Sequence, residues 1–474
     1  MARALPDALA AALVGLVVHL GFGGHGFLNY DSFYALAWGD AVLEGSTPDY
    51  GVPVAPTPHP LAIAVGALVS PLGAAAEDAL LALVLLALGA LCVGLFRLGQ
   101  ALYAWPVGLL AALLVATRQP ILNFGIRGYV DLPALALVVW AAVLEARRPR
   151  RGAPVLVLLA VAGLLRPEVW LYAAAYWAWV AWPAGWGERS RLAALAAAGP
   201  VLWALSDLAA TGNPLWSLMG TSSLAAELER PTGLGALPGV VPFRLGEILR
   251  APELVLAVIG CAAGLVWFRR RTLLPLALGA LNGLGFVVFA VAGLPLLGRY
   301  LFLAASMLAL LAALAALGWT VLGPEHPARG RWRAGGVLGL VVLAVFAPVQ
   351  AGRLEVLRAD IAARDEIQAD LLALVRAPRA ARVLEACGPL FVPNHRPVPS
   401  LAFWLDRPPG EILSAGLRRP TPDGVFLAPA SERVRRLSVL DPRDPRRLDA
   451  RVPDAYEPVA RNRSWVLHAG CRAP

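Results

Sequence analysis

The sequence predicts an α-helical, polytopic membrane protein with about eleven transmembrane helices and a small C-terminal extracytoplasmic α/β domain. Of its 474 residues, 58% are hydrophobic and 15% are charged, whereas soluble domains carry roughly a quarter charged residues. Apolar runs recur between residues 8 and 350, and charged residues become frequent from residue 351 onward. We therefore expect a transmembrane domain at residues 1–350 and a soluble domain at residues 351–474.

Eleven apolar runs approach the length of about 20 residues that a bilayer-spanning helix requires. The runs lie at residues 8–28, 78–97, 103–119, 131–146, 153–167, 168–183, 192–209, 252–268, 272–293, 300–322 and 334–350. The first run is long for a signal peptide and lacks an obvious cleavage site, so we expect a retained helix.

The arginines between these runs predict the orientation in the membrane. With a cytoplasmic N-terminus, the clusters at residues 147–151, 269–271 and 329–333 fall on the cytoplasmic side, as the positive-inside rule requires. The C-terminal domain then lies outside the cytoplasm. Because this pattern accounts for the net charge of +9, we do not expect nucleic-acid binding.

The apolar run at residues 60–73 decides the topology. It is short for a crossing, and Pro71 and Gly73 end it. If it crossed the bilayer, the arginine clusters would lie outside. We therefore interpret residues 29–77 as one outer loop with helices at the membrane surface, and residues 210–251 as a second long outer loop.

With this topology, polar residues from distant segments gather at the outer membrane face. They are Tyr30, Asp31, Tyr34, His59, Arg127, Asp131, Arg166, Glu168, Arg299 and Tyr300. Ionisable groups at membrane depth are costly and usually mark a functional path. Carboxylates and cations that face one cleft could perform acid–base chemistry on a charged substrate.

Each of these groups also has a structural explanation. Asp31 and Asp131 could each cap the helix that follows it. Arg166 and Glu168 could pair only to neutralise a helical hairpin, and Arg299 could mark the membrane interface. The sequence leaves these alternatives open.

Several segments resemble the GT-C glycosyltransferases, membrane enzymes that use polyprenyl-phosphate sugars and include protein mannosyltransferases and aminoarabinose transferases. Residues 31–45 and 55–61 (APTPHPL) resemble the family's first outer loop. Three later motifs are similar to further family motifs: RGYVDLP at 127–133, GLLRPE at 163–168 and GRYL at 298–301. The resemblance covers about residues 8–322.

The sequence departs from the family pattern at two positions. Pro58, followed by His59, stands where relatives have a lysine. Ser32 follows Asp31, where relatives often have a second acidic residue. Both departures weaken the expectation of a bound metal ion and of a defined phosphate partner.

The resemblance implies an inverting glycosyltransferase of the cell envelope, which moves a sugar from a polyprenyl-phosphate donor to a glycan, lipid or protein acceptor. Asp31 and Asp131 would be the catalytic carboxylates and could share a divalent metal ion. Four residues are candidates for the donor phosphate: His59, Arg127, Arg166 and Arg299. Four more would support the site: Tyr30, Tyr34, Glu168 and Tyr300.

Two other classes of function compete with this one. A lipid or small-molecule transporter or flippase would line a path with intramembrane charges, commonly between two similar halves. A non-enzymatic scaffold would present the C-terminal domain to a partner. We favour the transferase because the sequence shows no internal repeat and its polar residues gather at one face.

The C-terminal segment has the pattern of a small α/β domain. An apolar stripe at helical spacing runs through residues 354–374, and short apolar runs follow at 382–387, 389–392, 424–427 and 465–468. Cys387 and Cys471 can form a disulfide if this domain lies outside the cytoplasm. Cys92 and Cys261 lie in apolar runs, and we expect them to be inert thiols. We expect a structural role for residues 394–397.

Overall fold

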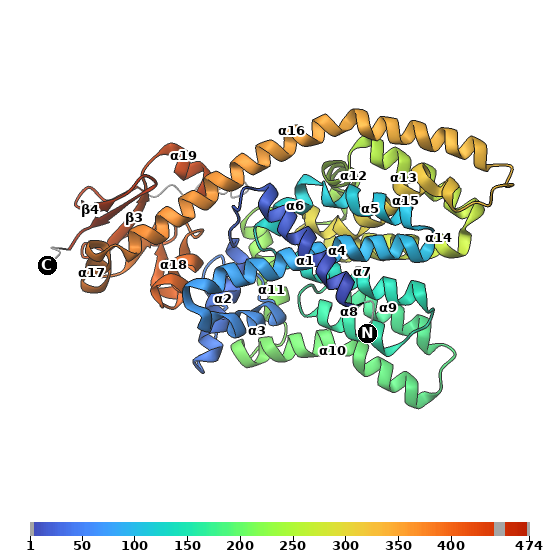
Figure 1. Cartoon of the computed structure of the whole chain (residues 1–474). Coiled ribbons are helices and arrows are strands. Elements are labelled where there is room, and N and C mark those ends of the chain that lie inside the picture. The colour runs from blue at the N-terminus through green and yellow to red at the C-terminus, as the bar shows by residue number, and fades with distance from the viewer. Residues whose placement is uncertain (1–3, 440–450, 472–474) are drawn as a thin grey trace. The chain divides into compact units, whose positions relative to one another are not determined.

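The computed structural model describes residues 4–439 and 451–471. Helices form most of the described chain, and the strands belong to its C-terminal part (Figure 1). The chain divides into two compact units. The first comprises Met1–Gly24, Ala82–Ser206 and Pro231–Arg358, and the second comprises His25–Leu81, Asp207–Arg230 and Ala359–Pro474. The second unit thus contains parts of both long outer loops, and the single boundary expected at residue 350 stays a prediction.

The first unit contains the helices that form in the predicted apolar runs, together with two helices that form largely outside those runs, at residues 119–126 and 237–248. They are α1 (Ala4–Gly21), most of α4 (Ala76–Leu102), α5 (Trp105–Ala116), α6 (Gln119–Ile126), α7 (Asp131–Arg147), α8 (Ala153–Gly163), α9 (Val169–Ala181), most of α10 (Trp186–Thr211), α12 (Leu237–Ile248), α13 (Ala251–Trp267), α14 (Arg269–Val291), η3 (Gly298–Leu301), α15 (Phe302–Leu317) and the first part of α16 (Arg329–Arg376).

Helix α15 forms the core of the first unit, since nearly all its residues are buried. Helix α13 packs closely against it. A Cβ at Gly260 would lie 1.8 Å from the carbonyl oxygen of Leu311, so this close approach requires a residue without a side chain. Small residues at such contacts are typical of helix packing in membranes.

The described residues contain five helical segments long and apolar enough to cross a bilayer: Pro60–Leu102, Trp186–Thr211, Arg269–Val291, Gly298–Thr320 and Arg329–Arg376. Two bent pairs raise the number to seven, Trp105–Ala116 with Gln119–Ile126 and Leu234–Ile248 with Ala251–Trp267. The chain is a multi-pass membrane protein.

The predicted number of eleven spans and the predicted orientation stay predictions. Each of the eleven apolar runs overlaps a helix. However, α8 and α9 have only 11 and 13 residues. Helices of that length are about 15–20 Å long, shorter than the hydrocarbon core of a bilayer.

In the second unit, α2 (Tyr30–Leu43) packs tightly against α3 (Pro60–Val69). A Cβ at Gly66 would lie 2.2 Å from the carbonyl oxygen of Ala35, and one at Gly39 would lie 2.3 Å from the amide nitrogen of Ala67. The ten residues of α3 are about 15 Å long. Gly73, with φ 56°, breaks the helical path before α4. This geometry suits the predicted surface helix, although the topology stays a prediction.

The C-terminal part of the second unit contains a five-stranded mixed sheet of order β2-β1-β3-β5-β4. The strands are β1 (Leu390–Val392), β2 (Ile412–Ser414), β3 (Val425–Pro429), β4 (Glu457–Arg461) and β5 (Trp465–Ala469). Strand β1 is parallel to β2 and β3, and β5 is antiparallel to β3 and β4.

The described part of this unit also contains the helices α11 (Trp216–Glu227), α17 (Pro378–Ala386), α18 (Val398–Leu405) and the short α19 (Glu432–Val434). The apolar stripe of α16, with Ile367 and Leu371, shares a core with the strands. A disulfide joins Cys387 to Cys471 with a Cα–Cα distance of 5.9 Å, connecting the end of α17 to the end of β5.

Candidate functional site

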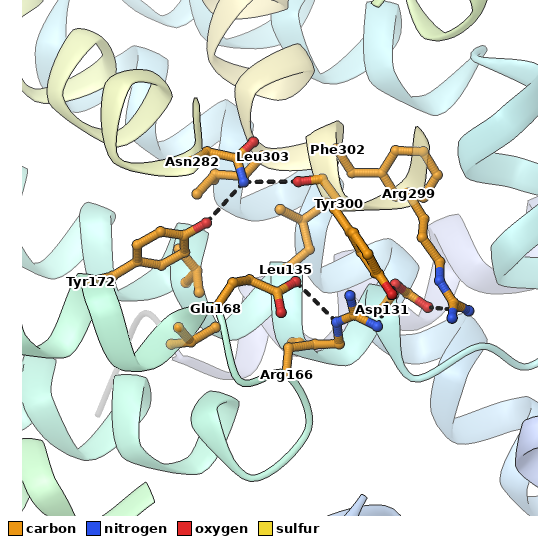
Figure 2. Close-up of a pocket in the computed structure, with 13 residues that line it drawn as sticks. Asp131, Leu135, Arg166, Glu168, Tyr172, Asn282, Arg299, Tyr300, Phe302 and Leu303 are labelled. Carbon is orange, nitrogen blue, oxygen red and sulfur yellow. Dashed lines mark hydrogen bonds and ion pairs between the residues drawn. The ribbon is translucent and has the colours of Figure 1, made fainter. Parts of the chain in front are cut away.

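A small polar pocket lies in the first unit, where α7, the turn between α8 and α9, α14 and η3 meet (Figure 2). All four charged residues that line it were singled out from sequence motifs: Asp131, Arg166, Glu168 and Arg299. Its empty space is about 350 Å³, including the open mouth.

Asp131 lies between two arginines. Its Oδ1 is 3.3 Å from Nη1 of Arg166, its Oδ2 is 3.7 Å from Nη1 of Arg299, and its side chain is 5% exposed. Asp131 is the first residue of α7, whose N-cap residue, Val130, makes no side-chain cap hydrogen bond. The carboxylate therefore serves an ion-pair network and not a helix cap.

Arg166 is buried and holds two carboxylates. Its Nε donates to Oε1 of Glu168 at 3.0 Å, and the guanidinium lies 4.4 Å from the centre of the Tyr300 ring. Burial lowers the pKa of Arg166, but the charges of Glu168 and Asp131 outweigh burial and raise it above its usual value. The Arg166–Glu168 pair expected for a hairpin turn thus extends to a third helix.

Arg299 is more accessible than Arg166, with 16% of its side chain exposed compared with 6%. Its guanidinium lies over the rings of Tyr129 and Tyr300, at 5.8 and 5.6 Å. Arg127 lies 5.3 Å from the same Tyr129 ring. Two arginines thus flank one aromatic ring beside Asp131.

Two pocket residues were missed in the sequence, Tyr172 and Asn282. The buried amide of Asn282 donates to the Tyr172 hydroxyl at 2.9 Å and to the Tyr300 carbonyl oxygen at 2.8 Å. Its Oδ1 accepts from the Ala304 amide at 3.0 Å. A signal was present, because an amide inside an apolar span is costly without partners, and Tyr172 lies one helical turn after Glu168.

The residues of this pocket do not suit a divalent cation. The two carboxylates, Asp131 and Glu168, are already matched by Arg166 and Arg299. Calcium and magnesium sites need several oxygen ligands with an excess of negative charge. A metal-ligand role for Asp131 and Asp31 stays a prediction, and the chemistry proposed for the pocket needs no metal ion.

A separate group of carboxylates lies in the second unit. Oxygen atoms of Asp40, Glu44 and Asp406 come within 4.8 Å of one another. Glu44 and Asp406 are exposed, so water solvates their charges. This cluster alone does not constitute a metal site.

Asp31 belongs to the second unit, at the start of α2. Asn29 caps this helix, since its Oδ1 accepts from the amides of Asp31 and Ser32 at 2.8 and 3.3 Å. The cap that the sequence allowed for the Asp31 carboxylate is therefore provided by Asn29.

Tyr30, the residue directly before Asp31, contacts other aromatic rings. The Tyr30 hydroxyl donates to the Val54 carbonyl oxygen, and the Tyr30 ring packs edge-on against Tyr34 and His395 at 5.0 and 5.4 Å. Burial raises the pKa of Tyr30 well above its usual value, and Tyr34 and Asp31 add to this shift. His59, directly before α3, is also buried.

The predicted site residues thus fall into two groups. Those of the first unit form one network beside Arg127: Asp131, Arg166, Glu168, Arg299 and Tyr300. Those of the second unit are Tyr30, Asp31, Tyr34 and His59. That both groups serve a single site stays a prediction.

No family model and no curated protein sequence matches the chain. Among solved structures, it is similar to the archaeal oligosaccharyltransferase AglB from Archaeoglobus fulgidus, which was solved with an inhibitory peptide and a dolichol-phosphate. The TM-score is 0.51 at 12% sequence identity, over 85% of this chain. The chain has the GT-C fold.

This result confirms the predicted GT-C fold, including the mainly helical membrane part and the small C-terminal sheet. At 12% identity the likeness concerns the fold alone, and the GT-C chain spans 64% of the length of AglB. The basis for a function is therefore the geometry and charge of the pocket.

Proposed function

We propose that this GT-C protein is an inverting glycosyltransferase that moves a sugar from a polyprenyl-phosphate donor to an acceptor at the outer membrane face. The observation that carries the proposal is the pocket in which Asp131 lies between buried Arg166 and more accessible Arg299. The dolichol-phosphate in the AglB structure supports a lipid phosphate as the ligand class.

Arg299 is the residue best placed to bind the donor phosphate. It lies 3.7 Å from Asp131, whereas Arg166 lies 3.3 Å from Asp131 and also donates to Glu168. Because 16% of the Arg299 side chain is exposed, compared with 6% for Arg166, Arg299 can reach a phosphate, while Arg166 remains in place as a tether. The planar guanidinium group suits two phosphate oxygens at once. Arg127, beside the same Tyr129 ring, would be the second cation.

The transfer would proceed in one displacement. Asp31 accepts the proton of an acceptor hydroxyl, and the hydroxyl oxygen forms a bond to the anomeric carbon. The bond between this carbon and the phosphate oxygen breaks on the opposite face, which inverts the configuration. The electron pair leaves with the lipid phosphate, whose charge the arginines stabilise. Asp131 would orient Arg299 and the acceptor.

The experiment uses membranes that contain the full-length chain and, as donors, radiolabelled farnesyl-phosphate esters of mannose, glucose and galactose. We expect release of farnesyl phosphate together with a labelled product. Asp31→Asn should reduce release at least 1,000-fold, in line with the loss of a general base and its charge. Asp131→Asn should also reduce it, and Glu44→Gln, an exposed carboxylate in the same loop, should not.

Normal turnover of the Asp31→Asn variant would disprove the assignment of the base. Movement of the intact sugar lipid between leaflets without release of farnesyl phosphate would instead indicate the transporter or flippase. Membranes that show neither release of farnesyl phosphate nor movement of the sugar lipid would indicate a non-enzymatic scaffold.

A further inference from the structure

The pocket has a second polar end, which the proposed phosphate contacts do not use. Glu168 and Tyr172 line it one helical turn apart, together with apolar Leu135 and Leu303 (Figure 2). The inference below rests on the proposed function, because it concerns the group that the phosphate carries.

The Tyr172 hydroxyl is an oriented donor. It accepts a hydrogen bond from Asn282 Nδ2 at 2.9 Å, so its own proton is left for another acceptor. Asn282 cannot reverse its amide, because Oδ1 accepts from the Ala304 amide and Nδ2 also donates to the Tyr300 carbonyl oxygen. These two backbone contacts fix the orientation of the Asn282 amide. The Tyr172 hydroxyl is therefore the acceptor in its hydrogen bond with Asn282.

The Glu168 carboxylate offers the complementary group. Its Oε1 accepts from Arg166 Nε at 3.0 Å. Its Oε2 is buried and has no hydrogen-bond partner among the described residues. A buried carboxylate oxygen without a partner costs free energy, and such an atom at a pocket wall indicates where a donor on a ligand belongs.

We propose that this end of the pocket binds a hydroxyl group of the donor sugar. A hydroxyl can accept from the Tyr172 O–H and donate to Glu168 Oε2 at the same time. A second phosphate or a carboxylate would be repelled by Glu168, and an ammonium group could not accept the Tyr172 proton. The pocket therefore has a phosphate end at Arg299 and a sugar end at Tyr172 and Glu168.

The inference makes these two residues determinants of sugar specificity. A site that hydrogen-bonds a substrate hydroxyl discriminates strongly against analogues that lack it, because its buried polar groups are then left without partners. Arg299 should govern affinity for the lipid phosphate, whether or not a sugar is attached.

The test measures binding to the purified full-length chain in nanodiscs. The probes are sugar-free farnesyl phosphate and its mannose, glucose and galactose esters. The readout is the preference ratio, the Kd of sugar-free farnesyl phosphate divided by the Kd of the tightest-binding ester. Tyr172→Phe should lower this ratio about fivefold, as expected for one neutral hydrogen bond, and leave the Kd of farnesyl phosphate unchanged.

Glu168→Gln provides a second variant. Its amide oxygen would remain on Arg166, so its NH₂ group would face the pocket and replace an acceptor by a donor. The preference ratio should fall about tenfold. Tyr176→Phe is the matched control, because Tyr176 lies on the same helix and its hydroxyl donates to Glu145 at 2.6 Å, away from the pocket. It should leave both Kd values unchanged.

The inference is overturned if both variants keep the wild-type preference ratio, or if no ester binds more tightly than sugar-free farnesyl phosphate. The proposed function fails separately if the wild-type chain binds neither farnesyl phosphate nor its esters. If transfer depends on Asp31 while the two variants keep the ratio, the function stands and the sugar assignment is wrong.

Discussion

Arg166 and Arg299 carry the same charge into one pocket but differ in burial, with 6% and 16% of their side chains exposed. Arg166 contacts both Asp131 and Glu168, whereas Arg299 contacts Asp131 and is more exposed. In a buried ion-pair network, removal of the shared partner leaves uncompensated charge, which is strongly destabilising. These contacts support the proposed roles, a structural role for Arg166 and a ligand role for Arg299.

We expect Arg166→Leu to lower the stability of the folded protein by about 3 kcal/mol or more, because Glu168 then loses its ion-pair partner and Asp131 loses one of two. Arg299→Leu should cost less and should mainly weaken the binding of farnesyl phosphate. The measurement is the melting temperature of each single variant in detergent, with size-exclusion chromatography used to detect the loss of folded protein. Arg166→Leu combined with Glu168→Leu should recover part of the loss. Equal melting temperatures for the two single variants would contradict these roles.

The two aspartates show why single residues could not be interpreted from the sequence. Asparagine and aspartate both cap helices, and Asn29 and Asp31 both lie at the N-terminal end of α2. The hydrogen bonds assign the cap to Asn29. Asp131 opens α7 in a similar way, yet its oxygens face arginines from two later segments. Local propensity was the same in both cases. A local hydrogen bond decided the cap of α2, whereas contacts with distant residues decided the surroundings of Asp131.

Helix α3 is the element on which the proposed topology depends. It packs so closely on α2, through Gly39 and Gly66, that neither position has space for a Cβ. It has ten residues, and Gly73 with φ 56° separates it from α4. A short helix tied to its neighbour suits the membrane surface better than a crossing.

Sided labelling tests this topology. With Cys92 and Cys261 replaced by alanine, single cysteines at Ser46→Cys and Ala74→Cys should both react with a membrane-impermeant maleimide added outside intact cells. Both positions are exposed and flank α3. Glu325→Cys, in a predicted cytoplasmic loop, should react only after permeabilisation. Labelling of Ser46→Cys without Ala74→Cys would show that α3 crosses the bilayer and would remove the proposed mechanism.

The element boundaries also show what hydrophobic pattern can predict. Each predicted apolar run overlaps a helix, and three of the four short apolar runs after residue 381 became β1, β3 and β5. The run at 382–387 lies largely in α17 instead. Short apolar runs do not distinguish strand from helix, because periodicity needs more residues to be visible.

The number of spans was harder to predict, because two apolar stretches are bent. Helix α5 turns by 67° into α6, and the segment Leu234–Ile248 turns by 103° into α13. Hydropathy measures apolar content along the chain and does not detect bends between helices.

The C-terminal sheet is joined by the disulfide between Cys387 and Cys471, which are 84 residues apart. Replacement of both cysteines by serine should lower the stability of this part of the chain by about 4.5 kcal/mol in the loop-entropy model. The change is measured as the temperature at which limited proteolysis begins to cleave within residues 378–471. Cys261→Ala, outside the sheet, is the control. An unchanged unfolding temperature would show that the bond does not stabilise the sheet.

The membrane class, the positions of the helices that contain the apolar runs and the motifs that supply charge are all predicted by the amino-acid sequence alone. These features depend on residues that are close together in the sequence. They are the hydrophobic runs, the arginine clusters between them and the residues that begin and end helices. The GT-C fold was predicted correctly for the same reason, since its motifs occur in order along the chain.

Folding in three dimensions determined which charges meet. Arg166 is shared by two carboxylates, Asn282 orients Tyr172, and Asn29 leaves Asp31 without the capping role. Each of these pairings depends on side-chain distances of a few ångströms between residues, most of them on different helices. Electrostatic and hydrogen-bond energies fall steeply with such distances, so packing, and no pattern along the chain, selects the partners.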